Sequence, residues 1–251
     1  MAILTRPRVS PPDEENPYWM SFSDLMSGLL IIFILAAIAL IIELTQKSAN
    51  WDEVIEQVKK AEEARDSLVT EIQRELSKEG IQVVINDSTS VITIPEKQLK
   101  FGSARFDLPR DESTLAGVQK IGEVLYSALT KDERSSYLDT IFVEGHTDCV
   151  PYYNLNIKHN WGLSTFRAIA VWEFWTAQSK EALKLPLNTL TNGSNRKLFS
   201  VSGYADTRPL PNTVCDKAND AELSKNRRID LRFTVKRPSL DEYKALEESL
   251  R

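Results

Sequence analysis

The stretch TIFVEGHTD, from Thr140 to Asp148, decides the fold that the sequence predicts. It begins with apolar and β-branched residues, which is typical of a buried strand, and it ends on the polar residues Thr147 and Asp148. Apolar residues with helical spacing precede this run over residues 111–129 and follow it over residues 163–177. A strand between two helices indicates an α/β domain.

Four further strands are predicted around this unit. The first two form a hairpin, and the last one closes the domain. Alternating strands and helices require a sheet with helices on one face. We therefore expect an α/β domain, an α+β sandwich of βαβαββ order, over residues 81–237. The four strands are residues 81–85, 90–94, 198–204 and 229–235, and the hairpin turn is at 86–88.

Residues 45–80, which precede this domain, predict a helical stalk. Apolar or tolerated positions recur there with helical spacing, and the segment contains no proline. The narrow stripe suits a parallel two-stranded coiled coil, which would make the chain a dimer. The alternative is a helix that packs on its own domain. The stripe consists of Trp51, Val54, Val58, Ala61, Leu68, Ile72 and Leu76.

An uncharged apolar run lies nearer the N-terminus, from Leu25 to Ile42. As a helix rising ~1.5 Å per residue it is roughly 27 Å long, which is close to the ~30 Å hydrocarbon core of a bilayer. A cleaved signal peptide is the alternative, but two acids precede the run and no small-residue cleavage site follows it. We therefore expect one uncleaved transmembrane helix over residues 18–44.

The charges that flank this span predict its orientation. Arg6 and Arg8 precede it, whereas Lys47 is the nearest base after it. The positive-inside rule thus favours a cytoplasmic N-terminal tail, residues 1–17, with the C-terminal domain in the periplasm. Residues 238–251 form a C-terminal tail with the apolar spacing of a short helix.

Asp24 stands out at the start of the span. A carboxylate deep in a membrane helix costs about 2.5–3.5 kcal/mol, less near the interface. One interpretation is a helix cap or an interfacial charge. The other is a proton or cation site that faces the helices of a partner, with Ser27 one turn further on as a second oxygen.

The composition of the chain and its lack of catalytic motifs exclude several classes of function. The 251 residues carry a formal net charge of -5, with 42% hydrophobic residues, which excludes wholesale disorder and a nucleic-acid binder that works by bulk positive charge. No catalytic triad, phosphate-binding loop or zinc spacing is evident, so we expect neither an enzyme nor a cofactor. A metal site of His146, Asp148 and Asp206 is the alternative considered.

The segment around Asp24 resembles the membrane segment of the MotB family, the B subunits of ion-driven motors. The resemblance implies that Asp24 carries the translocated ion, H⁺ or Na⁺. It also implies two B chains inside a ring of five MotA-like membrane subunits. The shared pattern of aromatic, small, acidic, apolar and hydroxyl residues falls on Trp19, Phe22, Ser23, Asp24, Leu25, Met26 and Ser27.

The C-terminal region resembles the OmpA-like peptidoglycan-binding domain, which also terminates MotB proteins. The match runs in order from the first helix to the last strand, and the motif at Asn160 together with the insertion before it is closer to MotB than to OmpA. The matching residues are Phe101, Gly145 to Asp148, Tyr153, Asn154, Asn160 to Ala168, Gly203 to Pro209, and Asn226 to Asp230.

This second resemblance implies a ligand, the diaminopimelate of a peptidoglycan stem peptide. Asp148 would bind its ammonium group and Arg167 its carboxylate, a pairing that suits a zwitterion. Thr147 and Asn154 would contribute to the site, as would Arg228, for which a solvent-facing role is the alternative. The alternative to a ligand is an internal Asp148–Arg167 salt bridge.

Cys149 and Cys215 are the two cysteines of the chain. Both fall in loops that follow strands and that should lie at the same end of the sheet. In a periplasmic domain a disulfide between them is reasonable, and two separate thiols are the alternative.

Within the motor family, the short tail and the motif SFSDLMSG, from Ser21 to Gly28, resemble the MotB-like subunits of Zorya anti-phage defence systems. This resemblance implies a ZorA-like membrane partner and a role during phage infection. A flagellar stator subunit and a passive envelope anchor without ion transport are the alternatives.

Overall fold

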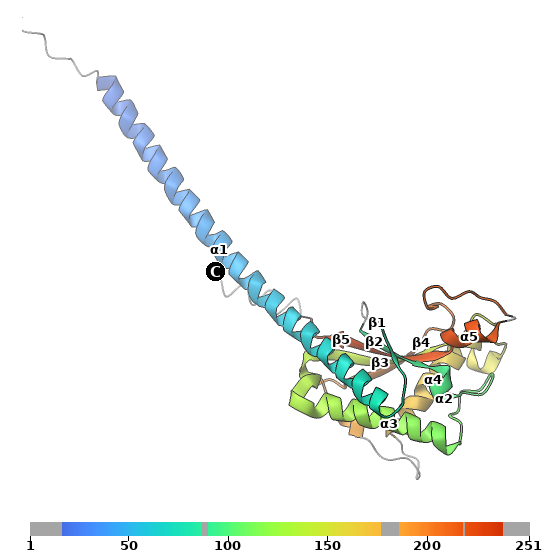
Figure 1. The fold of residues 1–251 in the computed structure, drawn as a ribbon. Helices are drawn as coiled ribbons and strands as arrows, with labels where there is room; N and C mark the ends of the chain where they lie inside the picture. The colour runs from blue at the N-terminus through green and yellow to red at the C-terminus, as the bar shows by residue number, and fades with distance from the viewer. Residues whose placement is uncertain (1–16, 87–89, 177–185, 218, 238–251) are drawn as a thin grey trace, which may run out of the picture. The chain divides into compact units, whose positions relative to one another are not determined.

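The computed structural model describes residues 17–86, 90–176, 186–217 and 219–237 (Figure 1). The predicted terminal tails and most of the hairpin turn lie outside these residues. The chain divides into two parts, one that ends at Glu53 and one that runs from Val54 to Leu240.

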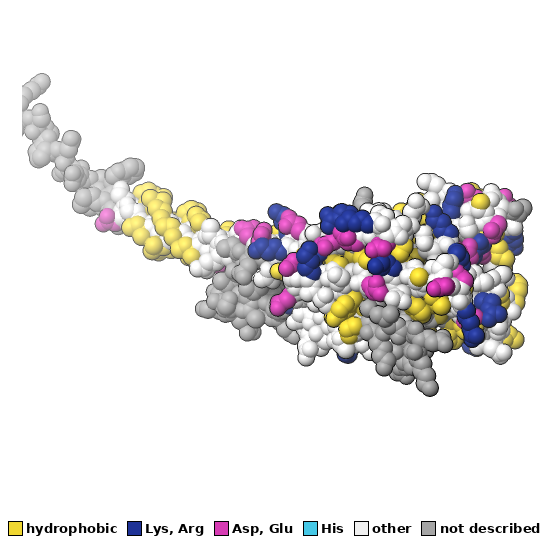
Figure 2. Space-filling model, turned by 60° about the horizontal axis from the view of Figure 1, so that its bottom comes forward, with side chains coloured by type: hydrophobic (Ala, Val, Ile, Leu, Met, Phe, Trp, Pro, Cys, Tyr) yellow, Lys and Arg dark blue, Asp and Glu magenta, His cyan; other side chains and the backbone are white. Residues whose placement is uncertain are grey.

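The first part consists of the beginning of α1, an uninterrupted helix from Pro17 to Lys78. Proline is favoured at the first helical position because its missing N–H would have no partner there. Within α1, Phe22–Ser48 has a mean hydropathy of 3.0 and is long and apolar enough to cross a membrane. Its side chains form a hydrophobic surface in Figure 2. The predicted apolar helix is confirmed.

The second part is a five-stranded sheet of order β1-β2-β5-β3-β4 with helices packed on it. β3 pairs parallel to β4 and antiparallel to β5, so the predicted α+β fold is confirmed. The strands are β1 Val84–Asn86, β2 Val91–Pro95, β3 Leu138–His146, β4 Phe199–Gly203 and β5 Arg228–Val235. The helices are α2 Glu96–Leu99, α3 Glu112–Thr130, α4 His159–Thr176 and α5 Asp220–Asn226, with 3-10 turns at Lys131–Tyr137, Leu155–Ile157 and Pro186–Thr189.

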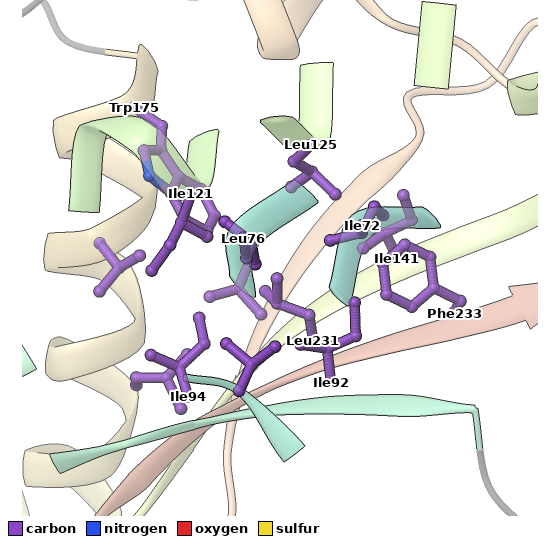
Figure 3. Close-up of a cluster of buried hydrophobic side chains, with 14 of the residues drawn as sticks. Ile72, Leu76, Ile92, Ile94, Ile121, Leu125, Ile141, Trp175, Leu231 and Phe233 are labelled. Carbon is purple, nitrogen blue, oxygen red and sulfur yellow. The ribbon is translucent and has the colours of Figure 1, made fainter. Parts of the chain in front are cut away.

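One face of the sheet carries the hydrophobic core. Ile92 and Leu231 of the sheet face Ile121 and Leu125 of α3, and Trp175 of α4 closes the cluster (Figure 3). Each of these side chains is at most 1% exposed. The indole N–H of Trp175 also donates to the carbonyl of Val118 at 2.7 Å, so burial leaves this donor satisfied.

The end of α1 belongs to this core. Leu68, Ile72 and Leu76 are fully buried in the same cluster as residues of the sheet and α3. Figure 3 shows Ile72 and Leu76 among them. The second half of the predicted stripe therefore packs on its own domain rather than on a partner helix. The compact domain begins well before residue 81, where we placed its boundary, and a coiled-coil stalk is not confirmed.

The opposite face of the sheet is polar but largely buried. Side chains alternate along a strand, so Arg228, Asp230 and Arg232 lie on the face away from the core. Glu144 on β3 accepts from Nε of Arg232 at 2.9 and 3.1 Å and from its Nη2 at 2.9 Å. Asp230 accepts from Arg228 and from Thr93 at 3.0 and 2.7 Å. These pairs satisfy charges that burial would otherwise make costly.

Candidate ligand-binding site

A pocket of about 440 Å³ opens at one edge of the sheet, where β2, β3 and β4 end and β5 begins. The parallel β3 and β4 bring the segments after them together, and the Thr147 N–H donates to the carbonyl of Ala205 at 2.9 Å. The pocket is lined by Glu96, Ser103, Ala104, Thr147, Asp148, Val150, Pro151, Tyr152, Asn160, Leu163, Arg167, Asp220, Leu223 and Arg227.

Two glycines let α4 approach the ends of β3 and β4. A Cβ atom on Gly145 would lie 1.9 Å from the carbonyl oxygen of Ser164, and one on Gly203 would lie 2.2 Å from Oγ1 of Thr165. The Ser164 hydroxyl accepts from the Ala205 N–H at 3.0 Å, which ties the helix to the loop after β4. This close contact places Arg167, one turn further along α4, at the pocket.

The Arg167 guanidinium is held in a fixed position. Its Nε donates to the carbonyl of Arg105 at 2.9 Å and its Nη2 to the carbonyl of Gly102 at 3.2 Å. The group also lies 5.1 Å from the centre of the Phe101 ring, and the residue is 4% exposed. Burial lowers the pKa of Arg167 from its usual value, although the nearby carboxylate of Glu96 opposes this shift. The pocket thus contains a preorganised cation.

Asp148 supplies the opposite charge, but its partner is not Arg167. Its Oδ1 accepts from the N–H of Val150 at 2.9 Å, and its Oδ2 accepts from Nη1 of Arg227 at 2.9 Å. The internal Asp148–Arg167 salt bridge that we considered is therefore replaced by an Asp148–Arg227 pair. Thr147 is buried beside Asp148, and both residues line the pocket.

Arg227 is one of the pocket residues that sequence reasoning missed, together with Glu96 and Asp220. Its guanidinium bonds to Glu96 at 2.7 Å and to Asp220 at 2.8 Å as well as to Asp148. Burial tends to lower the pKa of Arg227, but the hydrogen bonds to these three carboxylates raise it. The signal was present in the pair Arg227–Arg228, of which we chose the second member.

Arg228 and Asn154 are not pocket residues. Arg228 begins β5 and turns to the polar face, where its Nε bonds to Asp230 and its Nη2 donates to the carbonyl of Arg208 at 3.0 Å. Adjacent residues of a strand point to opposite faces, which explains why Arg227 lines the pocket and Arg228 does not. Asn154 instead caps the turn at 155–157 and donates to the hydroxyl of Tyr152 at 3.0 Å.

The outer wall of the pocket is fixed by a side-chain amide and a disulfide. Asn160 donates to the carbonyl of Val150 and accepts from the N–H of Tyr152, both at 3.1 Å. Cys149 is joined to Cys215, 66 residues away in the sequence. This bond connects the residue after Asp148 to the loop that precedes α5.

Among the described residues, a metal-ligand grouping occurs next to the pocket rather than in it. It consists of Glu144, His146 and Asp230, and not of the predicted His146, Asp148 and Asp206. Each of its two acids is already paired with an arginine. Because these pairs balance the charge of the acids, the group does not suit a divalent cation. The pocket itself, with two guanidinium groups and three carboxylates, suits a ligand that bears both charges.

The fold and this site define a chain with one membrane-length apolar helix and an α+β domain that carries a charged pocket. No family model matches the chain. It is 26% identical to the "Uncharacterized protein YtxE" of Bacillus subtilis, over 87% of this chain and 88% of the relative. It is 23% identical to the "Zorya protein ZorB" of Escherichia coli, over 88% of this chain and 81% of the relative.

Solved structures resemble about two thirds of the chain. The cell wall anchor of the T6SS from Pseudomonas aeruginosa is 25% identical, with a TM-score of 0.44 over 66% of this chain and 97% of that one. A MotB-like protein from Desulfovibrio vulgaris is 18% identical, with a TM-score of 0.47 over 72% of this chain and 98% of that one. The chain is thus similar to ZorB over most of its length, and its sequence motifs resemble those of MotB and OmpA-like proteins.

Proposed function

We propose that this protein is the B subunit of an ion-driven motor of the bacterial inner membrane, anchored to peptidoglycan by its C-terminal domain. One observation carries the proposal: a single chain joins a membrane-length helix bearing Asp24 to a domain with a preorganised pocket for a zwitterion. The relative ZorB matches both parts, since it covers 88% of this chain. A defence motor of the Zorya type is therefore our first candidate, and a flagellar stator the second.

The pocket supports the anchoring role. The Arg167 guanidinium, which backbone carbonyls hold in place, can bind a carboxylate of the ligand, and the Asp148 carboxylate can bind an ammonium group. Diaminopimelate in a stem peptide presents both groups. In this proposal the domain lies in the periplasm, where the Cys149–Cys215 disulfide persists.

Asp24 supports the ion-conducting role. Its side chain is exposed on the surface of α1, with Ser27 one turn away and also exposed. A carboxylate there that faced lipid would cost about 2.5–3.5 kcal/mol, so the helix requires polar partners around it. Five MotA-like or ZorA-like subunits around two copies of this chain would supply them, with the N-terminus in the cytoplasm and H⁺ or Na⁺ as the carried ion.

Anchoring is tested with purified peptidoglycan sacculi and the full-length protein in detergent. Asp148→Asn and Arg167→Gln should each lower the bound fraction at least about tenfold, because each removes a charge-assisted contact. Arg196→Gln, which breaks a surface ion pair with Asp139 elsewhere in the domain, should bind like the wild type. Equal binding by all four proteins would rule out this pocket as the anchor.

Ion transport is tested with Asp24→Asn in the native host. The substitution keeps the size of the side chain but removes its charge, so motor function should fall to the level of a deletion strain. The protein level and sacculus binding should remain unchanged. Full function of Asp24→Asn would leave a passive anchor, and loss of phage protection without loss of motility would separate the defence motor from the flagellar one.

A further inference from the structure

We infer that Arg227 determines which ligands the pocket accepts, because a ligand must exchange partners with the Asp148–Arg227 ion pair. This inference rests on the proposed peptidoglycan-binding function and adds a specificity residue to it. The two oxygens of Asp148 are both engaged in this structure, one by the N–H of Val150 and one by Arg227. An incoming ammonium group must therefore displace Arg227 from Oδ2 or share that oxygen with it.

Only Nη1 of Arg227 contacts Asp148, to which it donates at 2.9 Å. Nε donates to one oxygen of Glu96 at 2.7 Å, and Nη2 lies 2.7 Å from the other oxygen of Glu96 and donates to Asp220 at 2.8 Å. Glu96 follows β2 and Asp220 begins α5, so the guanidinium is held from two sides. Nη1 can therefore give up Asp148 while the rest of the group stays where it is.

This arrangement favours a zwitterion over a simple amine. When a ligand ammonium takes Oδ2 of Asp148, Nη1 of Arg227 loses a carboxylate partner. A carboxylate on the same carbon of the ligand replaces it, so one ion pair becomes two. An amine without that carboxylate forms one pair at the expense of another and leaves the Arg227 charge less well compensated, which is costly in a partly desolvated pocket.

Arg167 does not duplicate this role. Backbone carbonyls, not carboxylates, hold its Nε and Nη2, so ligand binding breaks no ion pair of Arg167. Arg167 therefore adds attraction for the ligand carboxylate, whereas Arg227 links the ammonium and carboxylate contacts to each other. Removing Arg227 should weaken discrimination more than it weakens binding.

The test compares two muropeptides that differ in one group, with the full-length protein in detergent and binding measured by calorimetry. One carries meso-diaminopimelate with its free side-chain carboxylate, and the other carries the same residue with that carboxylate amidated. The wild type should prefer the free carboxylate, and Arg227→Gln should reduce this preference about tenfold by binding the amidated probe as well as or better than the wild type does.

Two further variants make the result specific. Arg227→Lys keeps the charge but not the three-way geometry, so it should retain an intermediate preference. Arg196→Gln makes the same substitution in an exposed ion pair with Asp139 and should keep the preference of the wild type. Thermal unfolding of each variant shows whether it is folded.

The possible outcomes distinguish a failure of the proposed anchoring function from a failure of the role of Arg227. A wild type that binds neither muropeptide overturns the proposed anchoring function and this inference with it. A wild type that prefers the free carboxylate, together with a folded Arg227→Gln that keeps the same preference, overturns the role of Arg227 alone. If Arg227→Gln does not fold, an unchanged preference in Arg227→Lys overturns it equally.

Discussion

At the scale of single residues, the charges of the pocket are held by the Asp148–Arg227 ion pair and by the backbone carbonyls that accept from Arg167. Thr147, Asp148 and Arg167 lie together because they sit at fixed places in a strand end and the helix after it. Arg227 could not be separated from Arg228, because a sequence does not show which of two adjacent side chains turns toward a pocket. The pairing of Asp148 with Arg227 depends on α5, which brings the chain back to this edge of the sheet.

Gly145 illustrates a constraint on a single atom. Gly145→Ala would place a methyl group 1.9 Å from the Ser164 carbonyl, so α4 would have to move away from β3. We expect a loss of about 3 kcal/mol or more in the free energy of unfolding, because backbone cannot yield as a side chain does. Urea denaturation of the full-length protein in detergent measures it.

Gly117 provides the matched control. It lies within α3, and nothing stands within 4 Å of an added Cβ. Gly117→Ala should therefore stabilise the protein by about 0.5–1 kcal/mol, because alanine is the better helix former. A loss for Gly145→Ala as small as the effect at Gly117 would contradict the close helix–strand contact.

At the scale of elements, periodic stretches were predictable and short ones were not. Apolar alternation and helical spacing located the five strands and both long helices of the domain. The two short helices, α2 with four residues and α5 with seven, are too short to show a period. Both nevertheless carry pocket residues, Glu96 and Asp220, so the part of the site that escaped prediction is the part that these helices supply.

The contact between α1 and the turn after α3 predicts a pH dependence. Glu71 of α1 bonds to Arg134 and Lys131, and these hydrogen bonds lower the pKa of its carboxyl from the usual value. A carboxyl group whose pKa is lower in the folded state stabilises the fold fully at pH values above its unfolded-state pKa. This stabilisation is lost as the pH falls through the folded-state pKa. Glu71→Gln should thus cost about 1 kcal/mol at pH 7 and progressively less below pH ~4.5.

Thermal melts from pH 7 to pH 3 measure this difference between the wild type and Glu71→Gln. Glu62→Gln changes an exposed acid of the same helix and serves as the control. If the gap between wild type and Glu71→Gln stays constant or widens on acidification, the ion pairs of Glu71 do not hold α1 to the domain.

At the scale of the whole molecule, the structure assigns the end of α1 to the domain. The stripe of apolar residues in the sequence was compatible with two packings, because a coiled-coil seam and a core-facing helix both repeat every three to four residues. The structure shows that this face packs on the core of the domain, since Leu68, Ile72 and Leu76 are each fully buried there. Periodicity shows that a face is apolar, but it does not show what covers that face.

A pair of truncations tests this assignment. The fragment 54–251 should unfold cooperatively, whereas the fragment 81–251 should show no cooperative transition and should bind a hydrophobic dye. Losing one buried Leu or Ile side chain costs about 2–5 kcal/mol, and losing three approaches the whole stability of a domain. Circular dichroism melts of both fragments measure whether each unfolds cooperatively. Similar cooperative melts would show that the domain does not need the end of α1 to fold.

The disulfide closes the segment between Cys149 and Cys215 into a covalent ring. Arg167 lies inside this ring, whereas Asp148 and Arg227 lie outside it on either side. A protease that cuts one peptide bond of the ring would leave two fragments that remain joined until a thiol reducing agent separates them. Damage to this surface of the protein would therefore go unnoticed on a non-reducing gel, and the charged groups of the pocket would stay on one connected molecule.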